Sequence, residues 1–150
     1  MIYREANPSD IKQMFIVRYA VKENILLSTD LVTTEITADY LTRRGKGWVC
    51  EIDNHITGFS IIDLIDHSVW ALFVHPEHES KGIGRKLHEL MLDWYFTKTG
   101  KTVWLTTDQH TRAESFYRKG GWTEVERIGL SEIKFELTAD QWQQKKNFYN

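Results

Sequence analysis

The stretch "LFVHPEHESKGIGRKLHELML", residues 72–92, passes from an apolar segment through two glycines into a basic and apolar run. Apolar residues recur at helical spacing from Leu87 to Trp94, which predicts an amphipathic helix directly after Gly82 and Gly84. Glycines at these positions let the backbone approach a ligand, and the first N–H groups of a helix attract anions. An anion is therefore the natural ligand of this turn.

Two common phosphate-binding motifs do not fit this turn. A Walker loop requires Gly-x4-Gly-Lys-Ser/Thr, and a dinucleotide fingerprint requires a third glycine where Leu87 stands. Lys81, Arg85 and Lys86 flank the glycines and supply charges that suit a phosphate. Taken alone, the glycine pair is equally compatible with a flexible connection between a strand and a helix.

The same stretch raises the question of a metal site. The candidate metal ligands considered in it are His75, Glu77, His78, Glu79 and His88. The Cys/His spacing of a structural zinc site is absent, and Pro76 makes the first part a turn rather than a helix that presents two ligands. We therefore predict no metal and interpret the histidines as solvated loop residues.

The rest of the chain alternates between strand-like and helix-like segments. We expect strands at 2–6, 48–52, 56–64, 69–74, 102–107, 122–128 and 131–137. We expect helices over 11–19, with Ile11, Met14, Phe15 and Tyr19 as its apolar stripe, over 37–44, ended by Gly45 and Gly47, over 84–99, over 111–119, and from a capping box at Thr138 to Gln141. Residues 23–36 are expected to form a loop or a broken helix. The pattern predicts a mixed sheet with helices in one domain, residues 1–150.

The composition argues against several classes of protein. A chain of 150 residues with 41% hydrophobic residues can bury one ordinary core, and a net charge of -2 does not favour nucleic-acid binding. The single cysteine, Cys50, is expected to be a buried strand residue in a reducing compartment. The sequence shows no signal peptide and no apolar run of membrane-spanning length. We expect a cytoplasmic protein that binds neither membrane nor nucleic acid.

A second block, "HTRAESFYRKGGW" at residues 110–122, follows a predicted strand. With residues 72–92 it resembles the GCN5-related N-acetyltransferase (GNAT) superfamily, whose members transfer an acyl group from acyl-coenzyme A. Gly82 and Gly84 resemble the glycines of the family's Q/R-x-x-G-x-G/A pyrophosphate motif. The second block is similar to the motif N-x-x-A-x-x-F-Y-x-x-x-G-F at Ala113, Phe116, Tyr117, Gly121 and Trp122. The order of elements agrees along nearly the whole chain.

The resemblance implies a fold, a donor and a set of site residues. The fold would be α/β (α+β), with a mixed, mostly antiparallel twisted sheet flanked by helices and a splayed acyl-CoA cleft. Acetyl-CoA would be the acyl donor, with no metal. The implied donor-binding residues are Phe73, Val74, Ser80, Lys81, Gly82, Ile83, Gly84, Arg85, His110, Ala113 and Tyr117.

The resemblance also implies the chemistry. An N–H group near Val74 would polarise the thioester, and Tyr117 would be the catalytic residue, because a phenol is protonated at neutral pH and can donate to a departing thiolate. The alternative is that Tyr117 simply packs its helix against the sheet. Two residues depart from the family's motifs: Glu79 stands where the first has Gln or Arg, and His110 where the second has Asn.

No general base is assigned. Some relatives carry a glutamate at the position of Ser68, which cannot serve as a base. Six substitutes remain open, each of which is also a common turn or surface residue: Glu35, Asp63, Asp66, His67, Asp108 and Glu132.

The acceptor is left open as well. Acids and aromatic rings at Glu23, Glu35, Glu132, Trp70 and Trp104 would suit a cationic amine such as a polyamine, an amino acid, an amino sugar or a peptide terminus. The sequence therefore predicts an acyl-CoA-dependent N-acyltransferase that acetylates a primary amine in a ternary complex. A non-catalytic acyl-CoA sensor or scaffold, O-acylation, another acyl donor and a homodimer all stay open.

Overall fold

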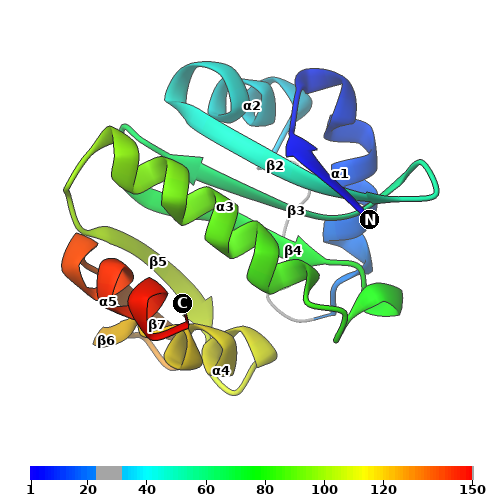
Figure 1. The fold of residues 1–150 in the computed structure, drawn as a ribbon. Helices are drawn as coiled ribbons and strands as arrows, with labels where there is room; N and C mark the ends of the chain where they lie inside the picture. The colour runs from blue at the N-terminus through cyan, green and yellow to red at the C-terminus, as the bar shows by residue number, and fades with distance from the viewer. Residues whose placement is uncertain (23–31, 150) are drawn as a thin grey trace.

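A seven-stranded sheet forms the centre of the protein, seen here in a computed structural model that describes residues 1–22 and 32–149 (Figure 1). The strands are β1 Ile2–Glu5, β2 Gly45–Ile52, β3 His55–Asp63, β4 Ser68–Val74, β5 Val103–Asp108, β6 Thr123–Ile128 and β7 Glu132–Leu137. The helices are α1 Ile11–Ala20, α2 Thr34–Asp39, α3 Ile83–Lys98, α4 Arg112–Lys119 and α5 Ala139–Tyr149. Most of the stretch at residues 23–36 for which a loop or broken helix is predicted lies outside the described residues, as does Glu23.

The strands lie in the order β1-β2-β3-β4-β5-β7-β6. Every neighbouring pair is antiparallel except β4 and β5, which are parallel. All seven predicted strands are present near their predicted positions, so the prediction of a mixed, mostly antiparallel sheet with helices is confirmed.

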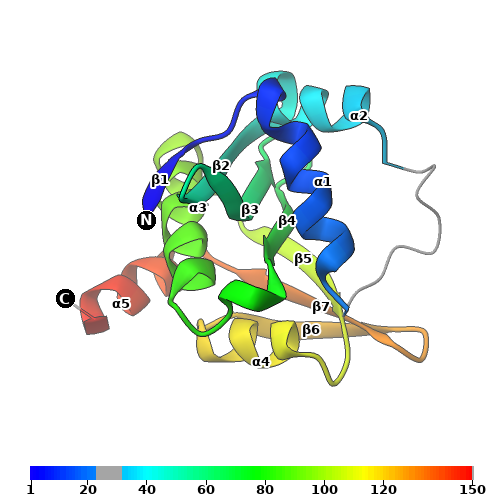
Figure 2. The same ribbon diagram turned by 90° about the vertical axis from the view of Figure 1, so that its right-hand side faces the viewer.

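Helices cover both faces of the sheet (Figure 2). On one face α3 buries Ile83, Leu87 and Met91 in the larger of two core clusters. On the other face α1 buries Ile11, Met14 and Val17 in a second cluster with Phe59 and Ile61 of β3. The two clusters fix α1 and α3 on opposite sides of β3 and β4, because each helix buries one apolar stripe.

Two local predictions are wrong. The predicted helix over 37–44 begins earlier, as α2, and continues as a π-helical turn at Tyr40–Arg44, which Gly45 ends as predicted. Gly47 does not take part in ending the helix, because β2 already begins at Gly45. A Cβ on Gly45 would lie 1.7 Å from the Ile62 carbonyl oxygen, so glycine is required there by the approach of β3. Tyr19, which was predicted to lie in the buried stripe of α1, is 49% exposed, and Val17 is buried instead.

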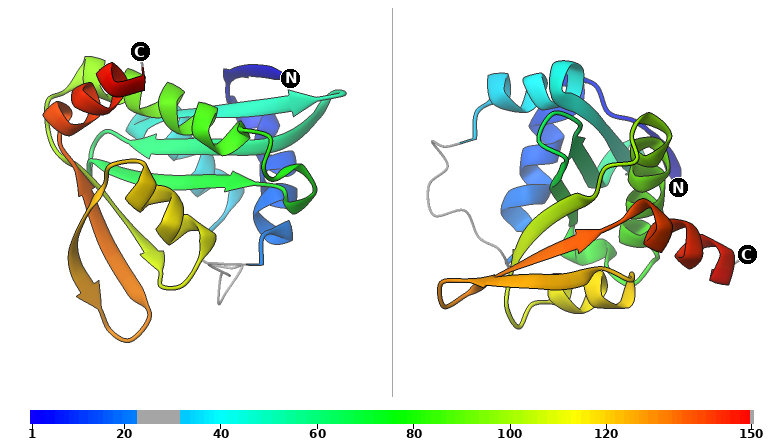
Figure 3. Two further views of the ribbon diagram at one scale, coloured as in Figure 1. Left: turned by 60° about the horizontal axis from the view of Figure 1, so that its bottom comes forward. Right: turned by 90° about the vertical axis from the view of Figure 1, so that its left-hand side faces the viewer.

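Side chains of α3 join the first half of the chain to the last. Trp122 donates an indole N–H to His88 Nε2 at 3.0 Å, and Trp142 of α5 donates to Asp93 Oδ1 at 3.0 Å. Figure 3 shows α5 beside the end of α3, and the β6–β7 hairpin extending away from it. The capping box predicted at Thr138 and Gln141 is present and begins α5. Among the described residues, no helix has the length and apolarity to cross a membrane.

Candidate functional site

The parallel strands β4 and β5 touch at one end and part at the other. Their register holds a single pair, Ser68 opposite Trp104, and the Trp104 N–H donates to the His67 carbonyl at 3.0 Å. From there the strands diverge toward their carboxyl ends at Val74 and Asp108. The carboxyl ends of parallel strands are where ligands bind in open sheets. A cavity of about 770 Å³ lies in this gap.

The turn from β4 into α3 forms one wall of the cavity. Gly82, the N-cap of α3, has φ 81°, in the left-handed region that glycine adopts at little cost. The Lys86 N–H donates to the Gly82 carbonyl at 3.1 Å, so the ladder of α3 begins there and the N–H groups of the first turn lie before it. A Cβ on Gly84 would meet only Val74 Cγ2, at 3.6 Å. A ligand can therefore approach this backbone closely.

The second wall consists of β5 and α4. Thr111 caps α4 by accepting the Glu114 N–H at 3.2 Å. Gly120 is the C-cap of α4, and Gly121 follows it with φ 91°. This helix places Tyr117 against the cavity, with its side chain in ring contact with Phe116, Trp122 and Phe135. Tyr117 is 6% exposed, and burial raises its pKa above the ordinary value of a phenol. The phenol is therefore protonated across the physiological range of pH.

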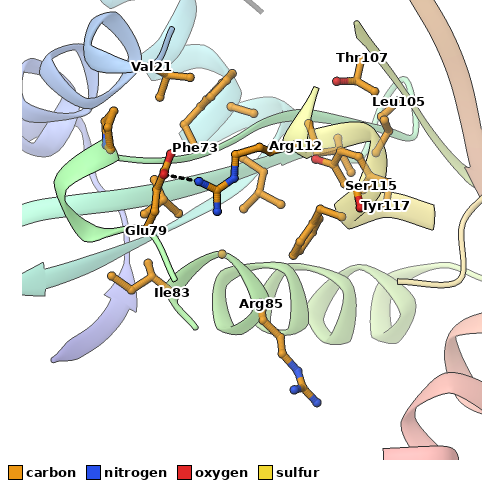
Figure 4. A pocket seen from close by; sticks show the side chains of 18 of the residues that line it. Val21, Phe73, Glu79, Ile83, Arg85, Leu105, Thr107, Arg112, Ser115 and Tyr117 are labelled. Carbon is orange, nitrogen blue, oxygen red and sulfur yellow. Dashed lines mark hydrogen bonds and ion pairs between the residues drawn. The ribbon is translucent and has the colours of Figure 1, made fainter. Parts of the chain in front are cut away.

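An ion pair joins the two walls. Arg112, the first residue of α4, binds Glu79 through Nη1 and Oε2, as the dashed line in Figure 4 shows. The acid that stands in place of the motif's Gln or Arg is therefore paired with a cation on the facing wall. Sequence reasoning missed Arg112; the available signal was an arginine in the second block opposite an unexpected acid in the first.

The cavity wall is cationic. Among its described lining residues, Glu79 is the single acid, and the basic ones are Arg18, Lys22, Arg85, Arg112 and Lys119. Figure 4 shows the Arg85 side chain pointing away from the other labelled residues, whereas Arg112 reaches across the cavity. This excess of positive charge favours an anionic ligand.

Most of the predicted donor-binding residues lie together. The cavity is lined by Phe73, Val74, Ser80, Gly82, Ile83, Gly84, Arg85, Ala113 and Tyr117. The other two are not among the lining residues: Lys81 is exposed with Nζ 3.1 Å from His78 Nδ1, and His110, exposed at φ 61°, donates its backbone N–H to Glu114. Lys81 and His110 therefore lie beside the cavity rather than in its wall.

The six candidate bases lie elsewhere among the described residues. None of Glu35, Asp63, Asp66, His67, Asp108 and Glu132 lines the cavity. Asp63 is 1% exposed and bound to Arg44 at 2.6 Å, and His67 Nδ1 lies 3.0 Å from the Tyr95 hydroxyl. Both groups are engaged in holding the fold.

The predicted acceptor residues are also dispersed. Trp70 lines the cavity and stacks on Tyr40, with ring centroids 3.9 Å apart. Glu35, Trp104 and Glu132 are not among the described lining residues. Arg18 and Lys22, which sequence reasoning did not select, occupy the wall on the α1 side.

The histidines near the glycine turn are separated by their own contacts. His75 Nδ1 accepts the Glu77 N–H at 3.1 Å in the turn. The prediction of a solvated loop residue is wrong for His88, which is buried in α3 and accepts the Trp122 indole N–H. Across the part of the chain that the structure describes, no group of three or more His, Cys, Asp or Glu side chains is arranged to hold a metal ion.

The sequence matches one family model. The model described as "Acetyltransferase (GNAT) family" matches residues 10–122, which span both cavity walls and most of the sheet. No curated protein matches the sequence.

Solved acetyltransferases share the fold at low sequence identity. PaiA N-acetyltransferase from Thermoplasma acidophilum, solved in complex with coenzyme A, has 19% identity and a TM-score of 0.74 over 91% of this chain and 98% of that one. The ribosomal-protein-S18-alanine N-acetyltransferase of Escherichia coli has 16% identity and a TM-score of 0.76 over 91% and 92%. A GNAT-family acetyltransferase of Staphylococcus aureus Mu50 has 18% identity and a TM-score of 0.78 over 91% and 98%.

Proposed function

This chain belongs to the acetyltransferase (GNAT) family, and on that premise we propose that it transfers an acetyl group from acetyl-CoA to a primary amine. The observation that carries the proposal is the cavity between β4 and β5, which connects the glycine turn to the buried phenol of Tyr117. Residues 1–150 act as one such domain, and a cytoplasmic location fits the single, buried Cys50.

The donor is held mainly by backbone. The N–H groups of Ile83, Gly84 and Arg85 in the first turn of α3 bind the pyrophosphate, because a helix N-terminus carries unpaired donors and partial positive charge. Arg112 and Lys119 add charge from the facing wall. The open edge of β4 at Phe73 and Val74 pairs with the amide groups of the pantetheine arm.

The chain's residues then support direct transfer. The amine nitrogen attacks the thioester carbonyl carbon; the C–N bond forms and the C–S bond breaks, while an N–H group near Val74 stabilises the oxygen. Tyr117 donates its proton to the departing thiolate, and the nitrogen releases its own proton to water, from which the Tyr117 phenolate is protonated again. Burial raises the pKa of Tyr117, so the phenol holds its proton until the thiolate forms beside it.

The test is release of free thiol from acetyl-CoA with a panel of amines. We expect Tyr117→Phe to lower kcat by about 100-fold or more and to retain the rise in melting temperature that coenzyme A produces. Gly82→Val should lose that rise, because valine is strained at φ 81°. A chain that binds coenzyme A but acetylates no amine would instead be a sensor or scaffold.

A further inference from the structure

A buried hydrogen bond connects the helix of the glycine turn to the segment that follows Tyr117. His88 of α3 lies about one helical turn after Gly84, and its Nε2 accepts the indole N–H of Trp122 at 3.0 Å. Trp122 follows the end of α4, and its backbone N–H donates to the Tyr117 carbonyl at 3.1 Å. Because the side chains of His88 and Trp122 are both buried, the bond joins the two walls of the cavity from within the core.

The hydrogen bond defines the state of the His88 ring. An indole N–H can only donate, so Nε2 of His88 is the acceptor and carries no proton. Burial lowers the pKa of His88 to about 3, with a smaller effect of Lys145 in the same direction, so the ring is neutral at physiological pH. His88 therefore acts as a fixed acceptor for Trp122.

Ring contacts surround the side chain of Tyr117. Its ring centroid lies 5.3 to 6.3 Å from the centroids of four other rings, those of Phe116, Trp122, Phe135 and His88. In the part of the chain that the structure describes, no hydrogen bond holds the Tyr117 hydroxyl, so the packing of these rings sets the direction of the phenol. A movement of Trp122 would therefore turn the phenol relative to the cavity that Tyr117 lines.

The indole N–H gives Trp122 an orientation that packing alone would not give it. A buried N–H without an acceptor is costly, so the favourable position of the Trp122 ring is the one in which the N–H meets His88 Nε2. A phenylalanine, which the motif of the second block carries at this position, has no N–H and could pack in more than one way. The hydrogen bond therefore determines which edge or face of Trp122 meets the Tyr117 ring, and the two planes stand at 69°.

We propose that His88 and Trp122 position the phenol of Tyr117 for proton transfer to the departing thiolate. The inference rests on the proposed function, in which Tyr117 is the acid, and adds two positioning residues to it. His88 holds Trp122 through the indole N–H, and Trp122 holds the phenol through ring contact. Since His88 lies on the helix whose first turn binds the donor in the proposed function, the acid is held in place relative to the donor.

The test measures kcat and KM by thiol release from acetyl-CoA with the amine that the wild type acetylates best. We expect His88→Leu and Trp122→Phe each to lower kcat by about 10- to 100-fold, because a misplaced acid transfers its proton less efficiently. The KM for acetyl-CoA should change by less than about 3-fold, since the lost interaction acts in the transition state. His88→Gln should restore most of kcat, because its amide oxygen can accept the indole N–H.

Combined substitutions separate positioning from stability. In the Tyr117→Phe background, His88→Leu should change kcat by less than about 2-fold, because the residue through which His88 acts is already gone. Joining His88→Leu to Trp122→Phe removes acceptor and donor together, so the pair should recover much of the melting temperature that either single change loses, while kcat stays low. An equal loss of kcat with and without Tyr117, or a kcat that follows the melting temperature through these variants, would overturn the inference.

The matched control is Trp142→Phe. Trp142 of α5 also donates its indole N–H to α3, at Asp93, and among the described residues it has a ring contact with His88 but none with Tyr117. The variant removes an indole hydrogen bond of the same kind, so it should lower the melting temperature and leave kcat within about 2-fold of the wild type. A loss of kcat as large as that of Trp122→Phe would show that any disturbance of this core slows the reaction, which would refute a specific role of His88 and Trp122.

A second readout needs no turnover. The chain has six tyrosines, and in protein labelled with ¹³C at the tyrosine Cζ the NMR signal that disappears in Tyr117→Phe belongs to Tyr117. That signal should shift or broaden in His88→Leu and Trp122→Phe and stay in place in Trp142→Phe. If the wild type acetylates no amine, the proposed function fails, while this signal still decides whether His88 and Trp122 hold the phenol; an unchanged signal in His88→Leu would refute the positioning.

Discussion

The two edges of β4 differ in how completely they are paired. Toward β3 the strand is paired from Gly58 opposite Val74 to Asp63 opposite Ser68, whereas toward β5 it keeps the single pair of Ser68 and Trp104. One edge therefore satisfies its backbone groups within the sheet, and the other offers them to the cavity. Residues beside the closed edge are constrained by packing, and residues beside the open edge by what the cavity binds.

Gly58, in β3 at the closed edge, and Gly84, beside the cavity at the open edge, should show opposite changes in stability when replaced by alanine. A Cβ on Gly58 would lie 3.0 Å from Ile83 Cγ2 and 3.1 Å from Leu87 Cδ1, so Gly58→Ala should lower the free energy of unfolding by about 1–3 kcal/mol. A Cβ on Gly84 would meet only Val74 at 3.6 Å, and alanine favours a helix, so Gly84→Ala should raise stability by up to about 1 kcal/mol.

Urea denaturation measures both changes, and the shift in melting temperature with coenzyme A measures binding. Gly84→Val should reduce that shift, because its branched side chain stands where the ligand approaches, while Gly58→Ala should keep it. A stable Gly58→Ala variant would mean that α3 does not seat on β3 as closely as the distances indicate.

The same contrast explains what the sequence could predict. The strands and α3 follow from local periodicity, and the glycine turn and Tyr117 from two motifs with fixed spacing. Pairing of distant segments does not follow from a local pattern: Gly45 ends the helical turn as predicted, but the sequence does not show that Gly45 and Gly47 also lie where β2 needs room beside β3. Arg18 and Arg112 carry no motif, and only the folded chain brings them to the cavity.

Side chains around His88 connect the parts of the chain on either side of the open edge. A falling pH should weaken this packing. His88 is 5% exposed among Phe116, Tyr117, Trp122 and Trp142. Burial, with a smaller effect of Lys145, lowers the pKa of His88 to about 3. An unfolded chain binds the proton with a pKa of about 6.5, so the folded state is favoured fully above that pH and loses stability as the pH falls toward 3.

The free energy of unfolding should fall by up to about 1.4 kcal/mol for each pH unit below pH 6.5. Urea denaturation between pH 7.5 and 5 measures it, before most carboxylates titrate. His88→Gln should flatten the slope, because glutamine does not titrate, and the exposed His55→Gln should leave it unchanged. Parallel slopes in the wild type and His88→Gln would show that another group carries the pH dependence.

The smallest effect is expected at the ion pair that spans the open edge. Glu79 and Arg112 are 39% and 62% exposed in their side chains, so their pairing contributes little to stability, about 0.2–1 kcal/mol for pairs of this kind. Glu79 nevertheless repels a phosphate and competes with it for Arg112. Glu79→Gln should therefore leave the melting temperature of the free protein nearly unchanged and tighten coenzyme A binding by about 2- to 5-fold at low salt.

Titration calorimetry at low and high ionic strength checks this difference, which screening should remove. Glu77→Gln is the matched control, since Glu77 lies in the same turn without lining the cavity. Weaker binding in Glu79→Gln would mean that the carboxylate holds Arg112 in the position in which it binds the donor. Tighter binding would mean that Glu79 lowers the affinity for coenzyme A, because its carboxylate competes with the phosphate for Arg112.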